Sequence, residues 1–176
     1  MNKRTFLKLL GGVVAAPAGV IGYRSLQAGT EKPLPDSVKV TMDDNQKIVK
    51  IEISDAEWKK KLSQAQYKVL RKEGTERPFT SELNDEKRQG IYACAGCDLP
   101  LFSSETKFDS GTGWPSFFDA IPDHIGTSTD FKLIFPRTEY HCIRCGGHQG
   151  HVFKDGPQPT GLRYCNNGVA LNFTAA

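Results

Sequence analysis

Five cysteines are the residues of this 176-residue chain whose type and spacing most directly indicate chemistry. Four of them form two Cys-x-x-Cys pairs, Cys94 with Cys97 and Cys142 with Cys145, while Cys165 stands alone. Two such pairs supply the four thiolates of a closed tetrahedral zinc site, which leaves no open position for a substrate. We therefore predict one structural zinc ion held by the four paired cysteines.

Other uses of the paired cysteines fit the same spacing. Two disulfides are an alternative in an exported protein, and Cys94 with Cys97 could serve as the redox pair of a general disulfide reductase. Iron also accepts four thiolates in tetrahedral geometry, so the spacing does not separate it from zinc. Two pairs in one small chain favour a metal over disulfides, and a bound metal would exclude the disulfide reductase.

The fifth cysteine, Cys165, lies in the segment GLRYCNNG at 161–168. In an extended strand, Arg163, Cys165 and Asn167 share one face, which places a guanidinium, a sulfur and an amide side by side. The charge of Arg163 favours the thiolate, and so lowers the thiol pKa and raises its reactivity. The alternative is an inert cysteine buried in the core.

Two histidines, His148 and His151, follow directly after the last paired cysteine. Histidine can donate a proton near neutral pH, so both are candidate acids for a thiol reaction. A second metal site formed by these histidines and Cys165 is the alternative, but only Asp155 is spaced to join it.

A glycine-rich run, DSGTGWPSFF at 109–118, surrounds Trp114. A tryptophan at such a position can belong to the core. The glycines and the proline around it, however, suit the wall of a pocket formed on a loop.

The segments that position these residues are predicted to be mainly strands. Short apolar runs at 90–93, 131–135 and 169–173 alternate with turn-forming residues, and the stretch 48–53 alternates as a first short strand does. A capping box at Ser54, followed by apolar residues at helical spacing, predicts one amphipathic helix that ends at Gly74. The sequence IYACAGC also resembles EYHCIRC, which suggests two copies of one cysteine turn.

The positive charge of the chain is concentrated at its start. Residues 1–28 hold four basic residues and no acidic one, so the remainder carries 23 − 4 = 19 basic against 20 acidic residues. A nearly neutral body without a basic stripe argues against a nucleic acid as partner.

Residues 1–28 are predicted to be an export signal, because Lys3 and Arg4 precede an apolar run and a polar stretch ends at Ala28. The order KRTFLK resembles a twin-arginine signal with Lys-Arg as its pair. An uncleaved membrane anchor is the alternative, since roughly 20 apolar residues span a bilayer. We assign 29–50 to a linker and 51–176 to the folded domain, and expect a location in the bacterial periplasm or anchored facing it.

The motifs together resemble those of the methionine-R-sulfoxide reductases, from about residue 54 to residue 173. In the family's order they are the two Cys-x-x-Cys pairs, GWPSF at 113–117, HxxHVF at 148–153, DGP at 155–157, PTG at 159–161 and RYCxN at 163–167. The resemblance implies a mainly β fold, α+β, of two antiparallel sheets with short N-terminal helices and a structural zinc.

The resemblance also implies roles for the site residues. Cys165 is the expected nucleophile, and Trp114 and Phe117 are expected to bind the substrate, with the S-methyl group against the tryptophan. Asn167 is expected to form hydrogen bonds near the reacting centre. Two further residues, Asp155 and Arg163, are expected to orient the site residues and to set the local charge without contacting the substrate.

The chemistry follows from these residue types. The Cys165 thiolate attacks the sulfoxide sulfur while His148 or His151 protonates the oxygen, which yields methionine and a sulfenic acid. With the methyl group against Trp114 and the oxygen against the histidines, only one epimer presents its sulfur to Cys165, and the resemblance implies that it is the R epimer.

Many family members carry a resolving cysteine where this chain has Thr112. Since the other cysteines are expected to hold the metal, a thioredoxin-like or glutaredoxin-like donor should reduce the sulfenic acid. Oxidised proteins are the expected substrates and a monomer the expected state. The alternative function is a non-catalytic zinc-knuckle binding module of the same fold, in which Cys165 is inert.

Overall fold

The computed structural model of the protein describes residues 39–43, 46–132 and 134–176. The expected export signal at 1–28 lies outside the described residues, as does most of the expected linker. Within the part of the chain that is described, no helix is long and apolar enough to cross a membrane. This part is mainly β with short helices near its start, which confirms the predicted fold class.

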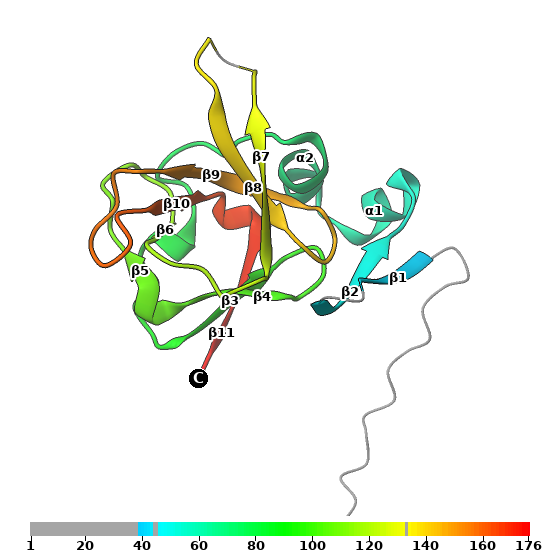
Figure 1. Ribbon diagram of the computed structural model, residues 1–176, viewed down its shortest axis with the longest axis horizontal. Coiled ribbons are helices and arrows are strands. Elements are labelled where there is room, and N and C mark those ends of the chain that lie inside the picture. The colour runs from blue at the N-terminus through cyan, green and yellow to red at the C-terminus, as the bar shows by residue number, and fades with distance from the viewer. Residues whose placement is uncertain (1–38, 44–45, 133) are drawn as a thin grey trace, which may run out of the picture. The chain divides into compact units, whose positions relative to one another are not determined.

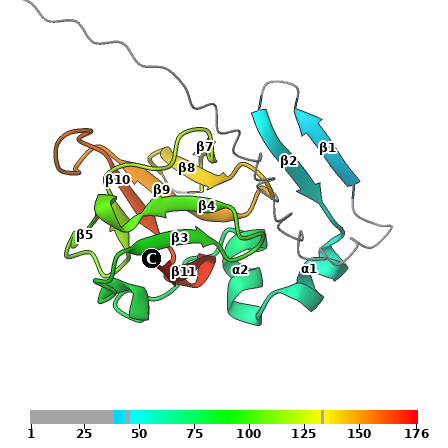
Figure 2. The ribbon, with the colours of Figure 1, turned by 90° about the horizontal axis from the view of Figure 1, so that it is seen from below.

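Two antiparallel sheets form the body of the domain (Figures 1 and 2). The larger sheet has the strand order β5-β6-β10-β9-β8-β7, with β5 at Lys107–Phe108, β6 at Ser116–Phe117, β7 at Ile125–Asp130, β8 at Arg137–Cys142, β9 at His148–Phe153 and β10 at Arg163–Asn166. The smaller sheet has the order β11-β3-β4, with β3 at Gly90–Cys94, β4 at Pro100–Ser103 and β11 at Leu171–Ala175. Two 3-10 turns, η2 at Ser104–Thr106 and η3 at Gly168–Ala170, connect the sheets, and a third, η1 at Glu82–Asn84, precedes β3.

Aromatic side chains from both sheets meet in the core. Alternation along β3 turns Tyr92 inward and Ile91 outward, because successive side chains of a strand point to opposite faces. Tyr92 packs edge-on against Phe117 at a centroid distance of 4.9 Å, and Phe102 stacks on Phe117 at 4.2 Å. The hydroxyl of buried Tyr140 donates a 2.6 Å hydrogen bond to Asn166 Oδ1. These contacts fix the inner face of β10, and so leave its other face for the site.

The predicted single helix is two helices, α1 at Asp55–Lys61 and α2 at Gln64–Lys72. Ser54 and Glu57 form the predicted capping box of α1. The chain then leaves the helical conformation at Leu62, and a second capping box, formed by Ser63, begins α2. The apolar spacing runs through this break, because Leu62 is buried although it is not helical.

Two further differences concern strands. In the run at 131–135, the described residues 131–132 and 134–135 do not form a strand but lie between β7 and β8, and Phe131, Ile134 and Phe135 are exposed. The alternating stretch at 48–53 does lie mostly in a strand, β2 at Gln46–Glu52, which pairs with β1 at Lys39–Asp43. This pairing lies within the stretch that the sequence assigned to the linker.

Candidate active site and metal site

The four paired cysteines come together as one buried cluster. Their sulfurs all lie within 4.8 Å of one another, with Cys94 Sγ 3.6 Å from Cys145 Sγ and Cys97 Sγ 3.4 Å from Cys142 Sγ. A disulfide would require about 2.05 Å. Four sulfurs at 2.3 Å from a zinc ion would lie about 3.8 Å apart, so the cluster fits a tetrahedral metal ion and not two disulfides.

The two cysteine turns share one backbone geometry, as the internal sequence similarity predicted. In the first, the backbone N–H of Cys94 donates to Leu99 O at 2.8 Å, and in the second Cys142 donates to Gly147 O at 3.0 Å. The residue after each second cysteine, Asp98 or Gly146, has a positive φ, of 57° and 66°. Each turn therefore presents two sulfurs in the same way, one from the β3–β4 connection and one from the β8–β9 connection.

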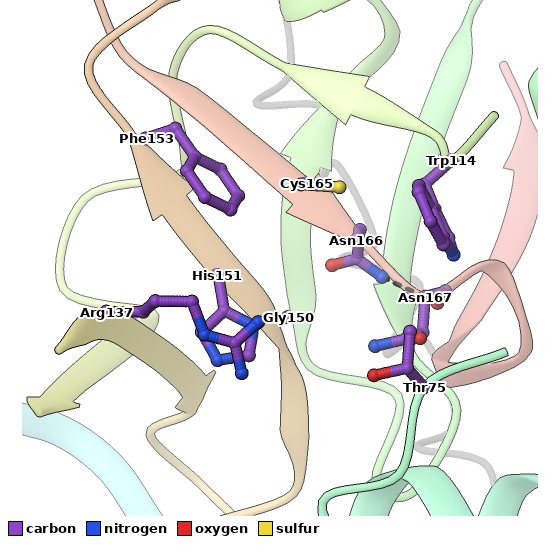
Figure 3. Close-up of a pocket in the computed structure, with 9 residues that line it drawn as sticks. All are labelled: Thr75, Trp114, Arg137, Gly150, His151, Phe153, Cys165, Asn166 and Asn167. Atoms are coloured by element: carbon purple, nitrogen blue, oxygen red, sulfur yellow. Dashed lines mark hydrogen bonds between the residues drawn. The ribbon is translucent and has the colours of Figure 1, made fainter. Parts of the chain in front are cut away.

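Cys165 lies elsewhere, on β10, directly opposite His151 of β9. Both side chains reach a pocket that is also lined by aromatic and polar residues from several elements (Figure 3). Its lining residues are Thr75, Trp114, Arg137, Gly150, His151, Phe153, Cys165, Asn166 and Asn167. The pocket has a volume of about 120 Å³. Since drug-sized ligands occupy roughly 300–1,000 Å³, this pocket suits the end of one side chain.

The surroundings of Cys165 act on its thiol in opposite directions. Burial raises its pKa, and this effect outweighs Arg163 and a hydrogen bond from Thr112, which lower it. Arg163 is itself held by Asp155 through two 2.9 Å hydrogen bonds, and its guanidinium stacks 4.4 Å from the centroid of Phe153. The expected lowering of the thiol pKa by Arg163 is therefore present, but the free thiol is protonated at neutral pH.

A carboxylate that the sequence analysis did not identify holds His151. Nε2 of His151 lies 2.7 Å from Oδ2 of Asp130, and Arg137 Nη2 donates to the same oxygen at 2.6 Å. These contacts and the backbone N–H of Lys132 hold the pKa of Asp130 well below its usual range. Because an ionised carboxylate only accepts, Nε2 of His151 carries a proton, and Nδ1 is the atom that gains or loses one. Burial lowers the pKa of His151, while the bond to Asp130 raises it.

The other histidine, His148, does not line the pocket, because it is 97% buried behind His151 with the ring centroids 5.5 Å apart. Its Nδ1 lies 2.8 Å from Oε1 of Glu139. Burial would raise the pKa of Glu139, but hydrogen bonds from His141, His148 and Ser128 outweigh burial and lower it to about 2. Among the described residues, Nε2 of His148 has no hydrogen-bond partner.

The opposite wall of the pocket is formed by Trp114 and Asn167 (Figure 3). The indole N–H of Trp114 donates to Glu76 O at 3.2 Å, and Asn167 Oδ1 accepts from Glu76 N at 3.0 Å. Asn167 also donates to Gln149 O at 2.9 Å. Both side chains are thus fixed by the backbone around residue 76, a partner that the sequence analysis missed.

Phe117, which was expected to bind the substrate, lies in the core instead. It is completely buried and stacked on Phe102. In the pairing of β6 with β10, Ser116 is opposite Cys165 and Phe117 is opposite Tyr164. The alternation of strand side chains therefore turns Phe117 away from the pocket. The phenylalanine that does line the pocket is Phe153, next to the HxxH motif.

The sequence analysis also missed Asp130, Arg137 and Glu139. They lie on β7 and β8, and no local motif connects them with the histidines. A signal was nevertheless present, because an alternating strand leading into the second cysteine turn must pair with the next strand, which carries His148 and His151.

Comparison with known proteins identifies the family of this chain. A model of the SelR domain matches residues 62–175. A peptide methionine sulfoxide reductase MsrB of Methanosarcina barkeri is 56% identical over 124 residues, which cover 70% of this chain and 87% of that protein. The chloroplastic peptide methionine sulfoxide reductase B1 of Arabidopsis thaliana is 47% identical over 152 residues, 86% of this chain and 73% of that protein. An MsrB of Agrobacterium fabrum is 51% identical over 125 residues, 70% of this chain and 93% of that protein. The chain therefore belongs to the SelR-domain family, that of the MsrB peptide methionine sulfoxide reductases.

Proposed function

We propose that this protein reduces the R epimer of methionine sulfoxide in oxidised proteins, with Cys165 as the nucleophile. One observation carries the proposal: among the described residues, Cys165 is the cysteine outside the metal cluster, and it faces His151 and Trp114 across a pocket of side-chain size. A nucleophile, a proton donor and an apolar wall are what reduction of a sulfoxide requires.

The reaction balances on one thiol. The sulfur of Cys165 attacks the sulfoxide sulfur, and the protonated oxygen leaves as water. Water then adds to the Cys165 sulfur while the new sulfur–sulfur bond breaks, which releases methionine, leaves a sulfenic acid on Cys165 and gives up a proton. The substrate gains two electrons and becomes methionine, while the cysteine is oxidised. His151 protonates the departing oxygen. Before this step the His151 ring is positively charged, and Asp130 stabilises that charge.

The arrangement of the walls supports selection of the R epimer. Trp114 lies on one side of Cys165, and His151 with Arg137 lies on the other (Figure 3). With the methyl group against the indole and the oxygen toward His151, only one of the two epimers presents its sulfur to Cys165, and we propose that it is the R epimer.

We infer that zinc is the metal of the cysteine cluster. The four sulfurs fit a tetrahedral ion, and zinc prefers four thiolates in closed structural sites. Such an ion would supply a link between the two cysteine turns, and Cys94, Cys97, Cys142 and Cys145 would hold it. All four are buried and lie outside the lining of the Cys165 pocket, so the ion takes no part in the proposed reaction.

An external thiol is the proposed reductant of the sulfenic acid. Thr112, not a cysteine, lies beside Cys165, and the remaining four cysteines form the metal cluster. A thioredoxin-like or glutaredoxin-like protein, or a small dithiol, would attack Cys165 and release water. We also propose that the protein acts as a monomer.

Export to the bacterial periplasm remains part of the proposal. It is supported by the sequence of residues 1–28, with its basic start and apolar run. Retention as a membrane anchor facing the periplasm is the alternative outcome. Fractionation of cells that express the full chain, with N-terminal sequencing of the product, separates the two.

The experiment that tests the activity is turnover of a methionine sulfoxide peptide, resolved by epimer, with dithiothreitol as donor. We expect loss of the R epimer alone, no loss with Cys165→Ser, and wild-type rates with Thr174→Ser, a change at an exposed position of β11. If metal-loaded wild type turned over neither epimer, the protein would be a non-catalytic binding module.

A further inference from the structure

Exposed apolar side chains are concentrated around the Cys165 pocket. Among the described residues, the large hydrophobic residues that are exposed are Phe79, Ile91, Phe131, Ile134 and Phe135. All but Ile91 belong to two segments that lie next to pocket-lining residues, as the contacts below show. Scattered exposed apolar residues are normal, but a group beside a pocket indicates an interaction surface.

The first side is the tip of the β7–β8 hairpin, which extends beyond the neighbouring strands (Figure 1). At its base, Asp130 and Arg137 pair with each other, and Arg137 lines the pocket. Beyond this pair, Lys132 forms an ion pair with Glu73, two residues before the pocket residue Thr75. The tip is thus held beside the pocket. Its apolar residues, Phe131, Ile134 and Phe135, are 74%, 94% and 80% exposed.

The second side is Phe79, which lies against the Trp114 loop. Its backbone N–H donates to Gly113 O at 2.7 Å, and Gly113 precedes the pocket residue Trp114. A Cβ on Gly113 would lie 2.8 Å from the Phe79 ring, so the two are in close contact. Phe79 has a φ of 62°, a conformation that bulky residues rarely adopt. An aromatic ring that is 74% exposed is therefore held in place by backbone contacts.

Four charged residues near the hairpin tip are already paired with one another. Arg137 is neutralised by Asp130 and Lys132 by Glu73, so the surface offers no free charge from these four residues to a partner. The pocket itself accepts only one side chain. The chain that carries an oxidised methionine must therefore cross the rims, where it meets Phe79 on one side and the hairpin tip on the other.

We propose that these two rims, Phe79 and the apolar residues of the hairpin tip, bind an extended polypeptide whose apolar side chains flank the oxidised methionine. The inference rests on the proposed function and deepens it, because it specifies the substrate class. The surface therefore favours an oxidised methionine whose neighbours along the chain are apolar.

The test compares kcat/KM for two peptides of equal length, one with Leu and Val beside the methionine sulfoxide and one with Ser and Gly. Wild type should prefer the apolar peptide. In a variant carrying Phe131→Ser, Ile134→Ser and Phe135→Ser, this preference should fall about tenfold, which corresponds to about 1.4 kcal/mol. Ile91→Ser, the matched control on β3, should keep the preference. Phe79→Asn, which retains a residue that tolerates positive φ, should lower it as well.

Three outcomes would overturn the inference. The first is an unchanged preference in the triple variant, or in Phe131→Ser alone if the triple variant fails to fold. The second is wild type that binds phosphatidylglycerol vesicles through the hairpin tip while peptide preference is unaffected, which would assign the surface to a membrane. The third is a dimer in sedimentation that the triple variant loses without a change in preference. Failure of the proposed function is distinguishable, because wild type would then turn over neither peptide nor free methionine sulfoxide.

Discussion

At the scale of single residues, two carboxylates determine how the histidines can act. Asp130 accepts from Nε2 of His151, and Glu139 accepts from Nδ1 of His148, so each ring is held in one orientation by a carboxylate. His151 reaches the pocket, whereas His148 lies behind it. This arrangement favours His151 as the proton donor and His148 as a residue that supports it.

Replacement of Asp130 should change the pH dependence of turnover. Asp130 raises the pKa of His151, so in Asp130→Asn that pKa falls further below its usual value. A step that needs protonated His151 is lost as pH rises through this pKa, so the basic limb of kcat/KM should move to lower pH. Glu105→Gln, at an exposed carboxylate, is the control. A lower rate with an unmoved limb would mean that Asp130 only holds the hairpin.

Arg163 and Asp155 should change the reactivity of Cys165 in opposite directions. Arg163 lowers the thiol pKa and Asp155 raises it. At pH 8, below that pKa, the thiolate fraction falls when the pKa rises, so Arg163→Gln should slow alkylation of Cys165. Asp155→Asn should accelerate it. Mass spectrometry of the Cys165 peptide after iodoacetamide measures both, and equal rates in the two variants would contradict this electrostatic account.

At the scale of elements, sequence predicts best where a pattern is local. The capping box at Ser54 and both cysteine turns are local, and the structure has them where they were predicted. The break between α1 and α2 was missed because its second capping box, at Ser63, lies within uninterrupted apolar spacing. The run at 131–135 was taken for a strand because burial is the usual reason for an apolar run, and here Phe131, Ile134 and Phe135 are exposed.

The second capping box gives a stability prediction. Ser63 accepts from the backbone N–H of Gln66 at 3.2 Å, and Gln66 returns a bond to the Ser63 N–H. Ser63→Ala removes one of these bonds and should lower the free energy of unfolding by about 1 kcal/mol. Chemical denaturation measures the change. Gln64→Ala, in the exposed first turn of α2, should have little effect, and equal stability of both variants would show that packing alone positions α2.

At the scale of the whole molecule, the metal cluster joins the two sheets, whereas the strands that line the pocket belong to the larger sheet. The cysteine turns belong to the β3–β4 connection of the smaller sheet and the β8–β9 connection of the larger one. The family, and with it the fold class, could be predicted from the order of the motifs. The partners of the histidines could not, because strand pairing joins residues such as Asp130 and His151 that lie 21 positions apart.

Removal of the metal should therefore weaken the attachment of the two sheets to each other and so lower the stability of the fold. The contact between Cys94 and Cys145 closes a loop of 51 positions, and a metal ion there stabilises the folded chain, because the four thiolates come together only in the fold. Cys97→Ser should lose the metal and about 4 kcal/mol or more of stability, which lowers Tm by roughly 10 °C. Cys165→Ser should retain one metal ion per chain, as measured by elemental analysis, together with the wild-type Tm. If Cys97→Ser kept the wild-type Tm, packing between Tyr92, Phe102 and Phe117 would hold the sheets together without the metal.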